Sequence, residues 1–102
     1  MRDHVRANWQ GMILVCGKCS RKVGGGFGPK GKAPLAKALR RHLGLARGRR
    51  AALGVVEVKC LGVCPRGAVV VLGGARPDRW LLAQPGADLD RLAADLTASA
   101  QA

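Results

Sequence analysis

Acidic and aromatic residues are scarce in this 102-residue chain, and their scarcity constrains both its core and its surface. With so few aromatic side chains, a hydrophobic core must be filled mainly by leucine, valine and alanine. A chain of this length fits one domain, which buries roughly 60 to 70% of the surface that its unfolded form exposes. A bound metal would help to stabilise so small a fold, because structural metals contribute about 10 kcal/mol or more in small domains. The three aromatic residues are Trp9, Phe27 and Trp80.

Long apolar runs are also missing. Nowhere do about 18 apolar residues occur together, and the first ten residues contain no apolar run of signal-peptide length. We therefore expect a cytoplasmic protein with no membrane partner. In that reducing compartment, the four cysteines of the chain are expected to bind metal or to carry redox chemistry rather than to form structural disulfides.

Basic residues are abundant, with 18 lysines and arginines against 6 aspartates and glutamates. No acidic residue lies between Asp3 and Glu57. Such a surface attracts polyanions or an acidic partner protein, although a solvated basic surface without a partner is an equally open interpretation. The basic residues between positions 18 and 50 are Lys18, Arg21, Lys22, Lys30, Lys32, Lys37, Arg40, Arg41, Arg47, Arg49 and Arg50.

The residue pattern divides the chain into an N-terminal arm (1–10), one domain (11–98) and a short tail (99–102). Trp9 is the only anchor expected for the arm. The continuous apolar run at 12–15 is typical of a buried strand that ends at Cys16.

The next part of the chain predicts a loop, a helix and a second strand. From Gly17 to Lys32 the chain is rich in glycine, lysine, arginine and proline, and we expect no regular element there. Apolar residues at helical spacing then predict a helix at about 33–43, with Pro34 in its first turn and Gly44 as its cap. A second apolar run predicts a strand at 55–58.

A strand, a helix and a strand in this order favour a parallel pair joined by a right-handed crossover. Parallel strands end at the same edge of a sheet, so Cys16 and Cys60 are expected to emerge side by side.

The remaining residues predict a β-hairpin and a helix. The β-branched run at 68–72 and the run at 79–83 flank turn residues, which is typical of two hairpin strands. Asp88 can cap a final helix. Its apolar face would comprise Leu89, Leu92, Ala93 and Leu96.

All the cysteines fall into two close pairs, which are C-x2-C at Cys16 and Cys19 and C-x3-C at Cys60 and Cys64. Two such pairs, separated by 40 residues, are a fairly specific signal for a site of four thiolates. Zinc and iron-sulfur clusters both accept four thiolates, so the spacing does not name the metal. Features that favour a cluster are glycine backbone amides and basic side chains beside the sulfurs. These residues are Gly17, Gly62, Lys18, Lys59 and Arg66.

The order of these elements resembles that of the thioredoxin-like [2Fe-2S] ferredoxins and of the related cluster domain of small NADH dehydrogenase subunits. The likeness spans about residues 11–97 and includes the stretch Cys60-Leu-Gly-Val-Cys64-Pro-Arg-Gly-Ala-Val-Val-Val71. The first cysteine pair is closer together than in many of these ferredoxins.

The resemblance implies a thioredoxin-like α/β fold, with β-α-β followed by a β-hairpin and a C-terminal helix. It also implies one-electron transfer without substrate turnover, and it allows a homodimer. The [2Fe-2S] ligands would be Cys16, Cys19, Cys60 and Cys64.

Two alternatives concern the same cysteines. One is a zinc-binding structural or interaction module. The other is a dithiol oxidoreductase, in which the first cysteine of a C-x2-C pair usually begins a helix that lowers its pKa. The predicted loop after Cys16 would postpone the helix to about residue 33, which counts against dithiol exchange.

Other functional signals are weaker. The stretch from Gly26 to Lys32 satisfies most of a phosphate-binding G-x4-G-K motif, but Ala33 stands where a magnesium-binding hydroxyl is needed. Only Phe27 lies in the basic region as a base-stacking residue, so nucleic-acid binding is expected only non-specifically. With four thiols sufficient for a site, His4 and His42 are not expected to be ligands.

Overall fold

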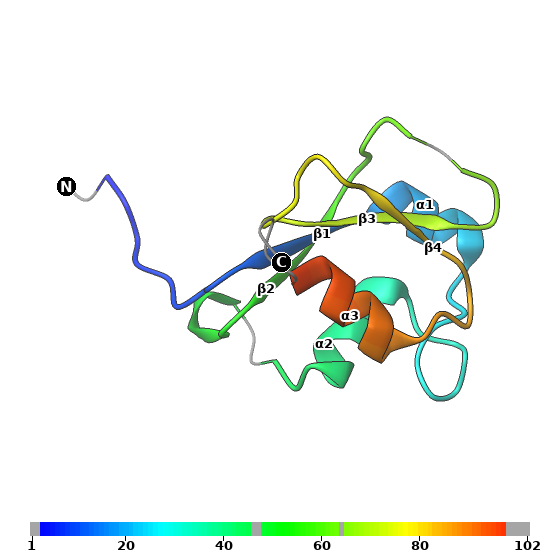
Figure 1. Cartoon of the computed structure of the whole chain (residues 1–102), viewed down its shortest axis with the longest axis horizontal. Coiled ribbons are helices and arrows are strands. Elements are labelled where there is room, and N and C mark those ends of the chain that lie inside the picture. Colours follow the sequence, from blue (N-terminus) through cyan, green and yellow to red (C-terminus); the bar gives the residue numbers. More distant parts are fainter. Residues whose placement is uncertain (1–2, 46–47, 64, 98–102) are drawn as a thin grey trace.

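A four-stranded mixed sheet organises the described residues, which are 3–45, 48–63 and 65–97 of this computed structural model (Figure 1). The order across the sheet is β2-β1-β3-β4. The strands are β1 (Met12–Cys16), β2 (Gly54–Val58), β3 (Val69–Gly73) and β4 (Leu81–Ala83). The helices are α1 (Gly17–Val23), α2 (Leu35–His42) and α3 (Leu89–Thr97), with a 3-10 turn η1 (Gly48–Arg50). No helix within these ranges is long and apolar enough to cross a membrane.

The two predicted strand pairs are confirmed. Strands β1 and β2 run parallel with Cys16 opposite Val58, whereas β3 is antiparallel to both β1 and β4. The hairpin strands begin slightly later than predicted, at Val69 and Leu81. The chain is therefore a small α/β domain in which β1 and β2 end at one edge of the sheet.

Helix α1 contradicts the prediction that residues 17–32 hold no regular element. Its backbone is stabilised from outside the helix, because the Lys18 N–H donates to the Lys59 carbonyl at 3.0 Å. It ends where the Gly24 N–H donates to the Ser20 carbonyl, also at 3.0 Å. No acidic residue occupies its first turn and its sequence carries no clear apolar period. Tertiary contacts, rather than local propensity, hold this helix.

The rest of the glycine-rich segment is tied down by Phe27. Its backbone N–H and carbonyl pair with the carbonyl and N–H of Ala33, both at 3.0 Å. The Phe27 side chain is buried in the core, whereas Trp80 lies exposed on the surface. Among the described residues, Phe27 is therefore the single aromatic side chain in a core that otherwise consists of aliphatic side chains and of Cys16 and Cys19.

The crossover helix α2 confirms the helix predicted at about 33–43, although Pro34 is its N-cap residue rather than part of its first turn. Its buried residues are Leu35, Ala36, Ala38 and Leu39. Helix α2 contacts both β2 and α3, and α3 contacts β1 and β3. The two helices therefore form one packed layer against the sheet (Figure 1).

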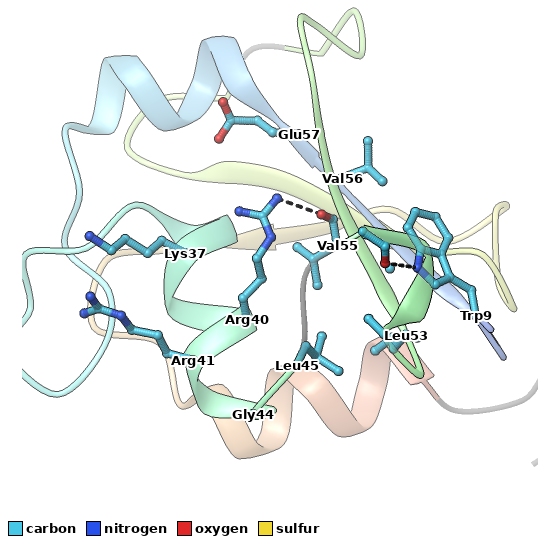
Figure 2. Close-up of a pocket in the computed structure, with 13 residues that line it drawn as sticks. Trp9, Lys37, Arg40, Arg41, Gly44, Leu45, Leu53, Val55, Val56 and Glu57 are labelled. Carbon is cyan, nitrogen blue, oxygen red and sulfur yellow. Dashed lines mark hydrogen bonds between the residues drawn. The ribbon is translucent and has the colours of Figure 1, made fainter. Parts of the chain in front are cut away.

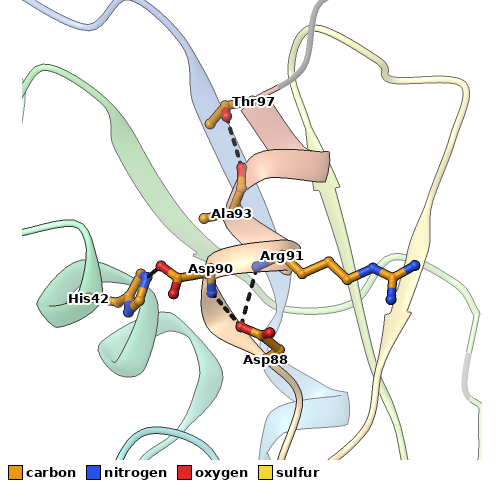
Figure 3. Close-up of polar contacts among 6 residues, drawn as sticks. All are labelled: His42, Asp88, Asp90, Arg91, Ala93 and Thr97. Carbon is orange, nitrogen blue, oxygen red and sulfur yellow. Dashed lines mark hydrogen bonds and ion pairs between the residues drawn. The ribbon is translucent and has the colours of Figure 1, made fainter.

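Asp88 caps α3, as predicted (Figure 3). Its Oδ1 accepts hydrogen bonds from the backbone N–H groups of Asp90, at 3.0 Å, and Arg91, at 3.4 Å. The Asp90 carboxylate in turn lies 2.7 Å from Nε2 of His42 at the end of α2. The same turn of α3 is thus fixed both by its cap and by a contact to the neighbouring helix.

Trp9 anchors the N-terminal arm, as expected, but it does not do so alone. Its indole N–H donates to the Gly48 carbonyl at 2.9 Å, and its ring lies over Gly54, where any side chain would overlap it. The backbone N–H groups of Asn8 and Gln10 also donate to the 48–54 segment, to the carbonyls of Arg49 at 2.7 Å and Ala52 at 2.8 Å.

Replacing the cap of α3 should destabilise the fold. We expect Asp88→Ala to lower the free energy of unfolding by about 1 kcal/mol, because two N–H groups lose their acceptor. Asp88→Ser, which keeps an oxygen at this position, should retain most of that stability in urea denaturation. Equal losses in both variants would contradict a capping role.

Candidate thiolate site

The structure describes three of the four cysteines and places them at one edge of the sheet. Cys16 ends β1, Cys19 lies in the first turn of α1, and Cys60 follows β2 by two residues. They come together because β1 and β2 are parallel and end in register. Cys64, the fourth predicted ligand, lies outside the described residues.

The three thiols differ strongly in exposure. Cys16 and Cys19 are 0% and 2% exposed, whereas Cys60 is exposed. The segment after β2 contacts the buried pair, since the Cys19 thiol donates to the Val63 carbonyl at 3.6 Å. The Gly62 N–H donates to the Cys60 sulfur at 3.3 Å. The site therefore has a buried side formed by the first pair and a solvent side formed by Cys60.

The surroundings of Cys16 favour its thiolate form. Burial alone would raise the pKa of this thiol, because it penalises the charged form. Backbone N–H groups of Cys19, Leu61 and Lys18, together with the Cys19 thiol, act in the opposite direction and hold the pKa of Cys16 below its ordinary value. A sulfur with these donors can carry the negative charge that a metal ligand needs.

Gly17 allows α1 to begin directly against β2. A Cβ atom at this position would lie 2.7 Å from the Val58 carbonyl oxygen and 3.2 Å from Cγ of Glu57. Only glycine permits this approach without a shift of the strand. The contact fixes the first turn of α1, which carries Cys19, relative to the strand that leads to Cys60.

Polar and charged groups complete the surroundings of the site. The Ser20 hydroxyl is buried beside Cys19 in α1 and has no hydrogen-bond partner among the described residues. Lys18, Lys59 and Arg66 are exposed. Their positive charges, close in sequence to the cysteines, oppose the negative charge that several thiolates would accumulate.

The three described thiols do not yet converge on one point. In residues 3–45, 48–63 and 65–97, no three His, Cys, Asp or Glu side chains lie close enough together to hold one metal ion. A metal ion shared by these three thiols would therefore require them to lie closer together. The donor set itself, soft sulfur with backbone amides, fits a thiolate-bound metal or iron-sulfur group.

The two histidines are engaged elsewhere. Nδ1 of His4 lies 2.7 Å from Oδ1 of Asp3, and His42 contacts Asp90 of α3.

The phosphate-binding-like stretch from Gly26 to Lys32 lies in the turn that is closed by the backbone hydrogen bonds between Phe27 and Ala33.

The main feature that the loop prediction missed is that Cys16 stands directly before a helix. The signal was present, because a C-x2-C pair immediately after a strand is the arrangement in which a helix usually follows. The glycine-rich residues from Gly24 onward obscured it, since α1 ends just before them. The expectation that the helix is postponed to about residue 33, which counted against dithiol exchange, is therefore wrong.

Comparisons of the chain with protein-family models, with curated proteins and with solved structures found no match. The chemistry of the site is therefore inferred from its own residues.

The difference in burial predicts an order of thiol reactivity. In the reduced, metal-free protein, we expect iodoacetamide to modify Cys60 at least about tenfold faster than Cys16 or Cys19, because thiolates react only where the reagent can reach them. Peptide mapping by mass spectrometry would measure the rates, with urea-unfolded protein as the control. Faster modification of Cys16 than of Cys60 would contradict the buried position of the first pair.

A side chain at position 17 should disturb the site from within. We expect Gly17→Ala to lower the free energy of unfolding by about 1–3 kcal/mol, because its methyl group must displace the β2 backbone. Lys18→Ala is the matched control, since Lys18 is the exposed neighbour and should change stability by less than about 0.5 kcal/mol. Equal stability of Gly17→Ala and the wild type in urea would show that α1 does not pack so closely.

Proposed function

We propose that this chain is a one-electron carrier in which the Cys16, Cys19, Cys60 and Cys64 thiolates hold a [2Fe-2S] cluster. The observation that supports the proposal is that Cys16 and Cys19 lie at the same end of the sheet as the segment that follows β2 and carries Cys60. There, buried Cys16 receives backbone N–H groups from its own helix and from Leu61 in the second cysteine segment. Amide donors to ligand sulfurs are a principal means by which proteins tune such clusters.

Some residues of the site would bind the cluster on its buried side, and others would lie on its solvent-exposed side. When bound, a [2Fe-2S] cluster supplies a single reversible electron. Cys16 and Cys19 would hold it against the sheet, away from water, while the exposed Cys60 would mark the side from which a partner exchanges electrons. Lys18 and Lys59 would offset the negative charge of the thiolates.

We further propose that the domain is thioredoxin-like. Support comes from the element order that the sequence resemblance implies, namely a β-α-β unit, a hairpin and a C-terminal helix. The additional helix α1 lies within the crossover and leaves this order unchanged.

Dithiol exchange is the second candidate, because α1 begins directly after Cys16 and the pKa of that thiol is lowered. Against it, neither Cys16 nor Cys19 is accessible to a partner disulfide, since both are at least 98% buried. Dithiol chemistry also assigns no role to the second pair. Zinc fits the same four sulfurs as iron does, so metal analysis has to separate a zinc module from an electron carrier.

The electron partner in this proposal is an acidic protein. The chain carries a formal net charge of +12, which would accelerate encounters with a negatively charged surface and would make them sensitive to salt.

Serine variants test the ligand set. In protein purified without oxygen, we expect Cys16→Ser, Cys19→Ser and Cys60→Ser each to lose visible absorbance and bound iron. Arg79→Ala, at an exposed arginine distant in sequence from the cysteines, should keep both. A coloured, fully loaded Cys60→Ser variant would contradict the assignment.

The same variants distinguish an electron carrier from the second candidate, a dithiol oxidoreductase. A dithiol enzyme would be colourless and would reduce a disulfide substrate such as insulin. It would lose that activity in Cys16→Ser but keep it in Cys60→Ser.

A further inference from the structure

A basic groove runs along β2, the outermost strand of the sheet, between this strand and α2 (Figure 2). Its volume is about 920 Å³. Strand β2 is an edge strand, because only β1 pairs with it in the described sheet. Backbone groups on such an edge can pair with an added strand unless something covers them.

Arg40 covers part of this edge. Its Nη2 donates to the Val55 carbonyl at 2.8 Å, so this carbonyl points away from β1 and toward the groove (Figure 2). Arg40 is nevertheless exposed to solvent on α2, and its hydrogen bond to Val55 is only partly buried. A guanidinium that is held by one neutral carbonyl prefers a carboxylate, which forms shorter and stronger charge-assisted hydrogen bonds.

Positive charge dominates the rim of the groove. Lys37 and Arg41 also line it, and in Figure 2 their side chains extend together from α2 in a direction away from β2, whereas Arg40 points toward Val55. None of these three cations forms an ion pair with a carboxylate in the described part of the chain. Of the described residues that line the groove, only Glu57 is acidic, and it lies near the first turn of α1. The groove therefore has uncompensated positive charge.

The opposite end of the groove is apolar. Leu45, Leu53 and the Trp9 ring line it, and all three are partly buried. Because Trp9 is already held by Gly48 and packs on Gly54, this wall is formed before any partner arrives. A preformed apolar wall reduces the entropy lost on binding.

We propose that this groove binds an extended, acidic segment of a partner protein, which adds to the β2 edge as a further strand. Arg40 moves from the Val55 carbonyl to a carboxylate of the incoming segment. The released carbonyl then accepts a backbone N–H from that segment. Lys37 and Arg41 bind further carboxylates, and apolar side chains pack against Leu45 and Leu53.

Charge complementarity selects this occupant over the alternatives. A second copy of the chain would place the same cations against one another. A nucleic acid would satisfy the cations but would leave the edge backbone without partners. This proposal rests on the proposed function only in naming the partner as a redox protein, because peptide binding here involves no cysteine.

The test uses a short synthetic peptide that alternates glutamate with valine, and a matched peptide that alternates glutamine with valine. Full-length protein purified without oxygen is titrated by calorimetry and by NMR. The acidic peptide should bind more tightly and should shift the amide signals of Val55 and Glu57. It should also shift the indole N–H of Trp9 and leave that of Trp80 unchanged. Iron content is measured on the same sample, so a missing cluster and a missing docking site are separate results.

Arg40→Ala gives the sharpest comparison. For the acidic peptide, the dissociation constant should rise about tenfold, because a charged hydrogen bond is lost. For the glutamine peptide it should stay equal or fall, because the Val55 carbonyl is then uncovered. Arg79→Ala, at an exposed arginine outside the groove, should change neither constant by more than about twofold. If Arg40→Ala changed the dissociation constants of both peptides by the same factor, the proposed move of Arg40 from the Val55 carbonyl to a carboxylate would be wrong.

Other outcomes would contradict the proposal that an acidic segment occupies the groove. Tighter binding of a single-stranded oligonucleotide than of the acidic peptide would assign the groove to nucleic acid. Self-association that Lys37→Glu alters would assign it to a second copy. Absence of peptide binding would leave Arg40 as a guard of the sheet edge only.

Discussion

The parallel pairing of β1 with β2 is the constraint on which the site depends. It sets Cys16 opposite Val58 and brings Cys16 and Cys19 to the same end of the sheet as Cys60, which is distant in sequence. The crossover that parallel pairing requires supplies α2, and α2 in turn forms one wall of the basic groove. One topological choice thus positions both the thiols and the surface that we assign to a partner.

Much of this arrangement could be read from the sequence. Continuous apolar runs identified the buried strands, turn residues identified the hairpin, and Asp88 identified the start of α3. These features are local, so their signals survive without knowledge of the fold. Helix α1 could not be found in the same way, because a hydrogen bond from Lys18 to distant Lys59 and the close approach of Gly17 to β2 support it.

The candidate site shows the same division. The spacing of the cysteines was enough to predict that their four thiols form one site, because cysteine is a metal ligand whatever the fold. It could not predict that Cys16 and Cys19 are buried while Cys60 is exposed, because that difference depends on the path of the segment after β2. The distribution of charged residues in the sequence could not locate the groove either. Arg40 covers the edge of β2 only because it donates a hydrogen bond to the Val55 carbonyl, which depends on the fold.

The most direct test of the central claim is the metal content and spectrum of the protein purified without oxygen. If the chain carries a [2Fe-2S] cluster, we expect iron and acid-labile sulfide in equal amounts, broad visible absorption, and a spin-half EPR signal at low temperature after reduction. A colourless protein that carries zinc, or one that binds no metal and reduces disulfides, would contradict it.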